Sequence, residues 1–250
     1  MTQTNGKRYA KPSYAYPEVR KFYLDMVREI AAYKPDAIVI EFLRHPPFFM
    51  YDPPLVKEYT RRYGQCTPKN YLDENWQKMI REIMTHHLKD ARKAIDEISP
   101  GTALEINFDD QDYMKHGIDL PAILKAGLVD VISPGIYHIG TAKTFPLAPF
   151  VAMIKESPRK VLLFPRVEGT IYGKDPTPEE EKGLVKIQRR SLSIPMFKGI
   201  FLDFLAQGAD GIRPFNSGGV DLAKALSDRT ALQRFAIFEM PLLDIRSNAN

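Results

Sequence analysis

Carboxylates stand at the ends of apolar runs that have the composition of buried β-strands. Glu41, Asp109 and Glu168 each lie at or just after the last residues of such a run. Ionisable groups are costly at buried strand ends unless they are paired or used. Two carboxylates facing each other across a barrel mouth suit glycoside hydrolysis. One protonates the leaving oxygen, and the other attacks the sugar or activates water. These three residues are therefore candidate catalytic groups.

Hydrogen-bonding side chains accompany the carboxylates. In the run that ends at Asp109, Glu105, Asn107 and Asp109 alternate with apolar residues, so the three polar side chains share one face of a strand. Groups that can bind a sugar also follow the other strands. The candidate substrate-binding residues are Arg44, His45, Asn107, Tyr137, His138, Arg166 and Asn216.

Each carboxylate also has a structural interpretation. Glu41 and Arg44 can form an ion pair beneath the mouth. Asp109 opens an acidic run that is typical of a solvated loop, and Glu168 precedes Gly169, as turn residues do. The histidines at the strand ends fit ordinary polar lining as well as general-base chemistry. Residue types and spacing leave these alternatives open.

A second constellation points to different chemistry. Gly208–Ile212 is followed by Asn216–Gly219 and a helix-like segment that begins near Asp221. A glycine-rich loop before a helix N-terminus can hold phosphate in a barrel. A phosphate-binding barrel enzyme is therefore an alternative. Against it, no strand-end lysine is placed for a Schiff base, and Asp221 puts a negative charge at the helix start.

We expect neither a metal nor another cofactor. His86 and His87 are adjacent on a predicted helix and therefore point in different directions. Cys66 is the only cysteine, and no Cys/His spacing indicates zinc. With no base partner indicated for its thiol, Cys66 is not a candidate nucleophile.

Helices and strands alternate along the chain. Apolar periodicity and breaker residues predict helices at 16–33, 54–63, 75–99, 120–126, 149–156, from 177 toward 205 with an interruption at Pro195, and at 221–226. They predict strands at 37–43, 103–108, 129–133, 160–167 and within 208–216. This order predicts an α/β fold in which parallel strands are joined by helical crossovers, within one domain over residues 1–250.

Composition excludes several classes of protein. The 250 residues are 44% hydrophobic and 26% charged, which is ordinary for a globular protein. A net charge of +4 without a basic run gives no reason to expect nucleic acid as a partner. No apolar stretch is long enough for a membrane span. The first residues contain no apolar signal-peptide core, which favours the cytoplasm, whereas a missing N-terminal segment would allow an extracellular or periplasmic location.

The motifs, taken in order, resemble a known family. Tyr16–Arg20, Asp36–Pro46, Leu128–Pro134 and Gly208–Asn216 resemble segments of bacterial glycoside hydrolase-like TIM-barrel proteins, often labelled family 10 glycosylhydrolases. The resemblance implies a (β/α)8 barrel that hydrolyses O-glycosyl bonds. It further implies that Glu41 ends the fourth strand as acid/base and Glu168 ends the seventh as nucleophile. Asp109 is the alternative catalytic carboxylate, and the family more often has Asp at the position of Glu41.

The same count leaves the barrel incomplete. If the strand at 37–43 is the fourth, the chain corresponds to the C-terminal portion of a barrel and carries about five of its eight strands. The first strand present would then be an exposed sheet edge, which predicts a homo-oligomer formed through that edge. A carbohydrate is the expected substrate or ligand. A barrel that binds carbohydrate or acts as a scaffold without catalysis is the remaining alternative.

Overall fold

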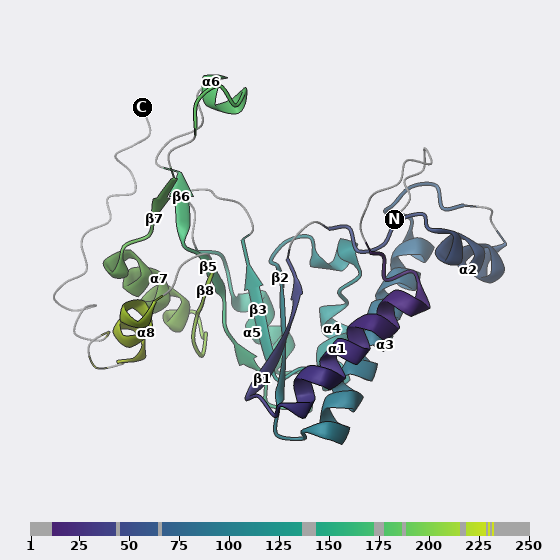
Figure 1. Cartoon of the computed structure of the whole chain (residues 1–250), viewed down its shortest axis with the longest axis horizontal. Coiled ribbons are helices and arrows are strands. Elements are labelled where there is room, and N and C mark those ends of the chain that lie inside the picture. The colour runs from purple at the N-terminus through teal and green to yellow at the C-terminus, as the bar shows by residue number, and fades with distance from the viewer. Residues whose placement is uncertain are drawn as a thin grey trace. The chain divides into compact units, whose positions relative to one another are not determined.

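The fold alternates helices and strands along the chain (Figure 1). A computed structural model describes residues 12–43, 46–64, 67–136, 144–172, 178–186, 189–215, 219–228, 230 and 232. The helices are α1 (Pro17–Ala32), α2 (Pro53–Tyr63), α3 (Glu74–Ile98), η1 (Tyr113–His116, a 3-10 helix), α4 (Leu120–Lys125), α5 (Ala148–Ile154), α6 (Pro178–Glu181), α7 (Ile194–Ala206) and α8 (Val220–Ser227). The strands are β1 (Ala37–Phe42), β2 (Ala103–Asp109), β3 (Val131–Gly135), β4 (Leu162–Leu163), β5 (Arg166–Glu168), β6 (Thr170–Tyr172), β7 (Arg189–Ser191) and β8 (Arg213–Phe215).

The main sheet has the strand order β1-β2-β3-β5-β8, and β4 also pairs with β3. The pairs β1/β2, β3/β5 and β5/β8 are parallel. This is the predicted α/β fold of incomplete TIM-barrel type, with helices between parallel strands. The chain divides into two compact units, Met1–Pro134 with Ala152–Leu162 and Gly135–Val151 with Leu163–Asn250, which are described separately.

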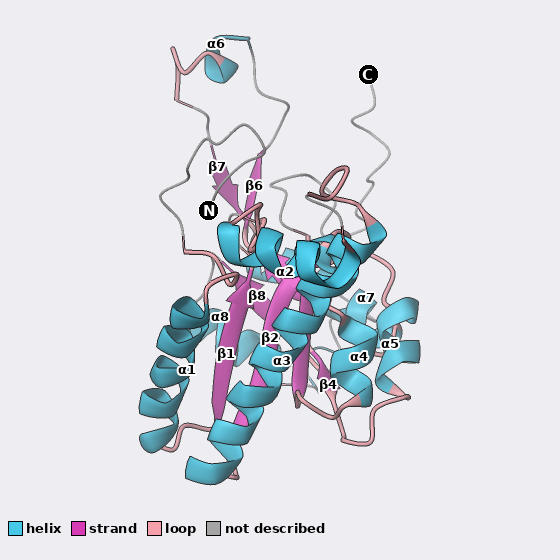
Figure 2. Ribbon diagram, turned by 90° about the vertical axis from the view of Figure 1, so that its right-hand side faces the viewer, coloured by secondary structure: helices cyan, strands magenta, loops and turns pink. Residues whose placement is uncertain are grey.

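Strand β2 of the first unit separates apolar from polar side chains, as the alternation predicts. Leu104, Ile106 and Phe108 are fully buried, on the opposite face of the strand from Glu105 and Asn107. Strand β1 runs beside β2 in a register that pairs Ala37 with Ala103 and Phe42 with Phe108. Helices α1 and α3 lie along these two strands (Figure 2). One face of the sheet thus builds a core under helices, and the other face carries polar groups.

The long helix α3 supplies more of the buried apolar side chains of that core than any other described element. The Asp73 side chain caps its start by accepting a hydrogen bond from the Trp76 backbone N–H at 3.1 Å. From Trp76 to Ile95 its apolar side chains recur at helical spacing. The fully or almost fully buried ones are Trp76, Met79, Ile80, Met84, Leu88, Ala91, Ala94 and Ile95. The pattern that predicts this helix from sequence is therefore the pattern that packs.

Helix α1 keeps much of its predicted apolar stripe exposed. Phe22, Met26, Ile30 and Tyr33 are 62%, 43%, 42% and 79% exposed. The buried face of the helix is instead formed around Val27 and Ala31. This helix leads into β1, the terminal strand of the sheet order, where the described residues provide no further strand to cover the stripe. The predicted sheet edge is present, and self-association through it stays a prediction.

Two aspartates, Asp130 and Asp210, each hold the start of a strand through the same pair of hydrogen bonds. The Asp130 backbone N–H donates to the Leu104 carbonyl oxygen, and the Asp130 carboxylate accepts the Leu104 N–H at 2.8 Å. In the second unit, Asp210 and Leu163 exchange the equivalent pair, with a carboxylate bond of 2.9 Å. A side-chain acceptor thereby satisfies a backbone donor at the end of a strand and fixes its register.

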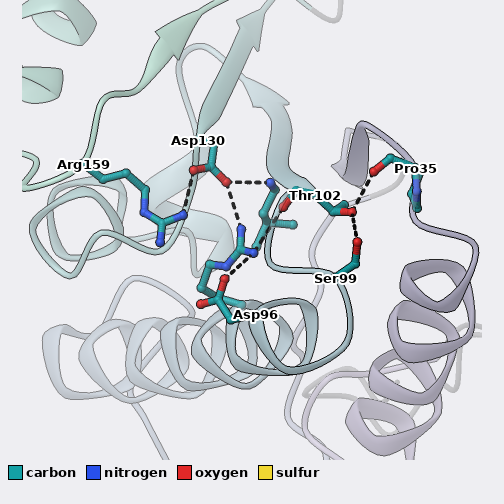
Figure 3. Close-up of polar contacts among 8 residues, drawn as sticks. Pro35, Asp96, Ser99, Thr102, Asp130 and Arg159 are labelled. Carbon is teal, nitrogen blue, oxygen red and sulfur yellow. Dashed lines mark hydrogen bonds and ion pairs between the residues drawn. The ribbon is translucent and has the colours of Figure 1, made fainter.

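The Asp130 carboxylate also binds the side chains of two arginines (Figure 3). It accepts hydrogen bonds from Arg92 at 2.9 Å and from Arg159 at 2.7 Å. The Arg92 side chain, which is 5% exposed, also bonds Asp96 at 2.6 Å and the Thr102 carbonyl oxygen at 3.2 Å. The network therefore ties α3 to the beginnings of β2 and β3.

The second unit corrects the expected long helix from 177 toward 205. Within its described part, α6 ends at Glu181 and Gly183 follows with a left-handed φ of 72°. Strand β7 then pairs antiparallel with β6, and a new helix, α7, begins after Ser193, whose hydroxyl accepts the Met196 N–H. Pro195 lies in the first turn of α7, where a missing N–H costs nothing, so it starts a helix and does not interrupt one.

The predicted strand at 160–167 is two short strands, β4 and β5. Phe164 and Pro165 separate them, and proline cannot donate to a sheet ladder. The predicted helix at 221–226 is present as α8, and the predicted last strand is shortened to β8. None of the described helices combines the length and the apolar character that crossing a bilayer requires.

Replacing Asp130 should destabilise the first unit. In Asp130→Ala the Leu104 N–H and the buried Arg92 guanidinium lose an acceptor, so we expect a loss of about 2–4 kcal/mol in the free energy of unfolding. Asp130→Asn keeps a neutral acceptor and should lie between that variant and the parent. The measurement is urea denaturation. Glu97→Gln, which loosens an exposed contact to Lys93 at 3.8 Å, is the control and should change stability by less than about 0.5 kcal/mol.

Buried His87 should make stability depend on pH. Burial and the nearby Arg20 lower its pKa to about 4, against a partial opposing effect of Asp90, whereas an unfolded chain has a histidine pKa near 6.5. The unfolded state therefore binds the extra proton first, and stability should fall by up to about 3 kcal/mol as pH drops from about 6.5 to about 4. Urea denaturation of His87→Leu should show a weaker decline. The exposed neighbour gives the control, His86→Leu, which should keep the decline of the parent.

Candidate functional site

The end of β1 brings two predicted site residues together. Glu41 and Asn107 are paired in the parallel register of β1 and β2. The Asn107 Nδ2 donates a hydrogen bond to the Glu41 Oε1 at 3.1 Å. Asn107 is fully buried, whereas Glu41 is exposed. A buried amide on β2 thus orients an accessible carboxylate at the C-terminal end of β1, the end at which barrel enzymes carry their active sites.

Two residues before Asn107, on the same face of β2, lies a second carboxylate that is not among the residues predicted from the sequence to form the site. Glu105 is 6% exposed, and its Oε1 accepts a hydrogen bond from the Ser133 hydroxyl of β3 at 2.6 Å. A short bond to an ionised acceptor is among the stronger hydrogen bonds in proteins. The alternation with Asn107 signals the face on which Glu105 lies. The partner Ser133 has no sequence signal, because it depends on the register between strands.

Asp109 is the last residue of β2. It is half-buried, and its Oδ1 accepts the Gln111 backbone N–H at 3.1 Å. Three residues later Asp112 pairs with Lys115 at 2.6 Å on an exposed surface. These local bonds are those of an acidic turn. The role of Asp109 as the alternative catalytic carboxylate stays a prediction.

The second unit carries the other candidate carboxylate on β5. Glu168 is 5% exposed, and its Oε1 accepts the Thr170 backbone N–H at 3.1 Å. It is therefore not a solvated turn residue. Arg166 lies two residues earlier on the same face of the strand and is 1% exposed. Its guanidinium stands 5.1 Å from the centre of the Phe215 ring, and Phe215 is the register partner of Glu168 on β8.

Gly135 makes room for Arg166. The two residues are register partners on β3 and β5. A Cβ at position 135 would lie 2.5 Å from the Arg166 Cβ and 2.8 Å from its Nε. Only glycine allows this approach without displacement of the arginine, so Gly135 is part of what positions Arg166.

Several predicted site residues lie outside the described residues. These are Arg44, His45, Tyr137, His138 and Asn216. Also outside the described residues are Arg44 of the proposed ion pair with Glu41 and most of the glycine-rich loop 216–219 of the phosphate alternative. Within the described residues no cluster of three or more His, Cys, Asp or Glu side chains is arranged to hold a metal ion.

Comparison with known proteins finds likeness in fold. No family model matches the chain, and no curated protein matches it by sequence. Among solved structures, a β-galactosidase from the psychrophilic Marinomonas ef1 is similar with a TM-score of 0.62 and 12% identity, over 94% of this chain and 46% of that one. A β-galactosidase from Bacillus circulans sp. alkalophilus has a TM-score of 0.57 and 13% identity, over 88% of this chain and 38% of that one.

A third similar structure has a different named activity. The α-L-fucosidase isoenzyme 2 from Paenibacillus thiaminolyticus has a TM-score of 0.53 and 15% identity, over 94% of this chain and 33% of that one. At these identities the likeness concerns the fold, which is that of glycoside hydrolases. The chain spans less than half the length of each of these three structures.

A methyl group at position 135 should disturb the Arg166 site. Gly135→Ala forces Arg166 or the β3/β5 pairing to shift, with an expected cost of about 1–3 kcal/mol in thermal or urea unfolding. Gly101→Ala is the matched control, because a Cβ there meets nothing within 4 Å. Equal stability of the two variants would show that the close approach imposes no constraint.

Proposed function

We propose that the chain is a glycoside hydrolase-like protein that hydrolyses O-glycosidic bonds. Glu168 is the nucleophile and Glu41 the acid/base, with Asp109 as the alternative carboxylate. The observation that carries the proposal is the fold shared with glycosidases, combined with carboxylates at the C-terminal ends of β1 and β5. The resemblance to the family 10-labelled proteins assigns the same two roles.

The local surroundings of each carboxylate fit its role. Glu168 is buried and held by the Thr170 N–H, so its direction is fixed before a sugar arrives. Glu41 is exposed and held by Asn107, which suits a group that must exchange a proton with a leaving oxygen and then with water. The described polar groups Asn107 and Arg166 are the proposed sugar-binding neighbours.

The proposed reaction has two steps. The Glu168 carboxylate forms a bond to the anomeric carbon while the glycosidic C–O bond breaks, and the Glu41 proton passes to the departing oxygen. Water then attacks the same carbon, gives its proton to Glu41 and releases Glu168. The net change is addition of one water across the glycosidic bond, and both carboxyl groups return to their starting states.

A binding protein without catalysis is the second candidate. Glu41 is exposed on the terminal strand of the sheet, whereas glycosidic chemistry benefits from a site that excludes water. Binding of a glycan to the chain without release of a shorter product would favour this candidate over the enzyme.

Amide substitutions should separate the two candidates. Nitrophenyl β-galactosides and α-fucosides are the first substrates to test, since the similar structures carry those activities. Glu168→Gln removes the nucleophile and should lower kcat/KM by at least about 10³-fold. Glu41→Gln should lower it by about 10²-fold or more, with the larger loss on poor leaving groups, which need the proton.

The control for these variants is Glu156→Gln, which changes an exposed carboxylate after α5 and should leave the rate unchanged. Chromatography of the products and circular dichroism of each variant accompany the rates. Full turnover in both Glu168→Gln and Glu41→Gln would contradict the proposal.

A further inference from the structure

Only one of the two polar groups of the Asn107 side chain has a hydrogen-bond partner among the described residues. Its Nδ2 donates to Glu41, while its Oδ1 is buried and has no hydrogen-bond partner among the described residues. A buried acceptor without a partner opposes folding, and a leucine of similar volume would avoid that cost. The position therefore carries an amide for a reason other than packing.

The unused oxygen belongs to a group that faces a titratable neighbour. Asn107 and Glu41 are register partners at the ends of adjacent strands, so the amide and the carboxyl stay next to each other. An amide offers both a donor and an acceptor, whereas an ionised carboxylate only accepts and a protonated carboxyl can also donate. The present arrangement, in which Nδ2 donates to Oε1, serves the ionised state of Glu41.

We propose that Asn107 is a positioning residue that holds Glu41 in both of its protonation states. When Glu41 is ionised, the Asn107 N–H donates to the carboxylate. When Glu41 carries a proton, its O–H donates to the Asn107 Oδ1 after rotation of the amide. The inference rests on the proposed function, because an acid/base residue must pass through both states in each turnover. One fixed partner then keeps the carboxyl directed at the same oxygen of the substrate.

Other titratable groups share this face. Glu105 and Asp109 lie on β2 beside Asn107, and Glu105 is held by Ser133. Arg44 follows Glu41 in the sequence. Any titration measured at Glu41 must therefore be separated from theirs, which Glu41→Gln, Glu105→Gln and Asp109→Asn spectra achieve by removing one carboxyl resonance each.

The test is a carboxyl titration by NMR of protein labelled with 13C glutamate, 13C aspartate and 15N asparagine. In the parent, the Asn107 side-chain NH2 resonances should move with the same midpoint as the Glu41 carboxyl. Asn107→Leu removes the partner of both states, so the Glu41 midpoint should shift by less than about 0.5 pH unit. Asn107→Asp adds a like charge and cannot donate when ionised, so the midpoint should rise by about 1 unit or more.

Kinetics supply the second readout. Asn107→Leu should lower kcat by about 10-fold or more on poor leaving groups across the whole pH profile, with little change on activated nitrophenyl substrates. The matched control is Asn75→Leu, at an exposed asparagine, which should change neither readout. If the parent hydrolyses no glycoside, the proposed function fails, while the titration still decides the relation between Asn107 and Glu41.

Two results would overturn the inference. A midpoint in Asn107→Leu that rises as far as in Asn107→Asp would mean that the amide serves the ionised state alone. NH2 resonances in the parent that do not follow the Glu41 titration would mean that Asn107 does not hold Glu41 in either state, and this measurement needs no variant to fold.

Discussion

The carboxylate of Asp130 determines how the strands of the first unit are aligned. It accepts the Leu104 N–H of β2 and hydrogen bonds from Arg92 and Arg159, while its backbone bonds both Leu104 and Leu162. Because strand side chains alternate, a register slip of one residue would turn Asn107 away from Glu41 and Glu105 away from Ser133. The contacts at the C-terminal ends of the strands therefore depend on a charge network at their N-terminal ends.

In the second unit an aspartate again fixes the start of a strand, with fewer charged partners. Asp210 holds Leu163 through paired backbone and side-chain bonds, and a glycine of positive φ, Gly208, precedes it as Gly127 precedes Asp130. In each case a glycine of positive φ follows the helix, and the aspartate lies shortly before the next strand. Each unit fixes its own strand starts, so each can carry polar side chains on β2 or β5 without losing register.

The sequence predicts those features that depend on local pattern. The period of β2 places Asn107 and Glu105 on one face, and the apolar stripe of α3 predicts its buried residues from Trp76 to Ile95. It fails where distant partners decide the outcome. Phe22 and Tyr33 have helical spacing but remain exposed, because the described residues provide no strand or helix that covers them, and the Glu105–Ser133 bond depends on pairing between strands. The segment after 177 has strong helix signals, yet β6 and β7 pair across it and divide the helix.

Polar groups buried on the strands oppose folding, and their distribution indicates what they are for. Glu105, Asn107, Arg166 and Glu168 are each at most 6% exposed, and they lie on β2 and β5. The buried arginine at the opposite end of β2, Arg92, has an aspartate partner on each side, as a structural charge requires. The Arg92 Nε nevertheless has no hydrogen-bond partner among the described residues, and neither has the Oδ1 of the Asn107 amide. Because Asn107 lies beside the exposed Glu41 and donates its N–H to it, a proton that arrives at Glu41 would supply the partner that the fold does not give to the Asn107 Oδ1.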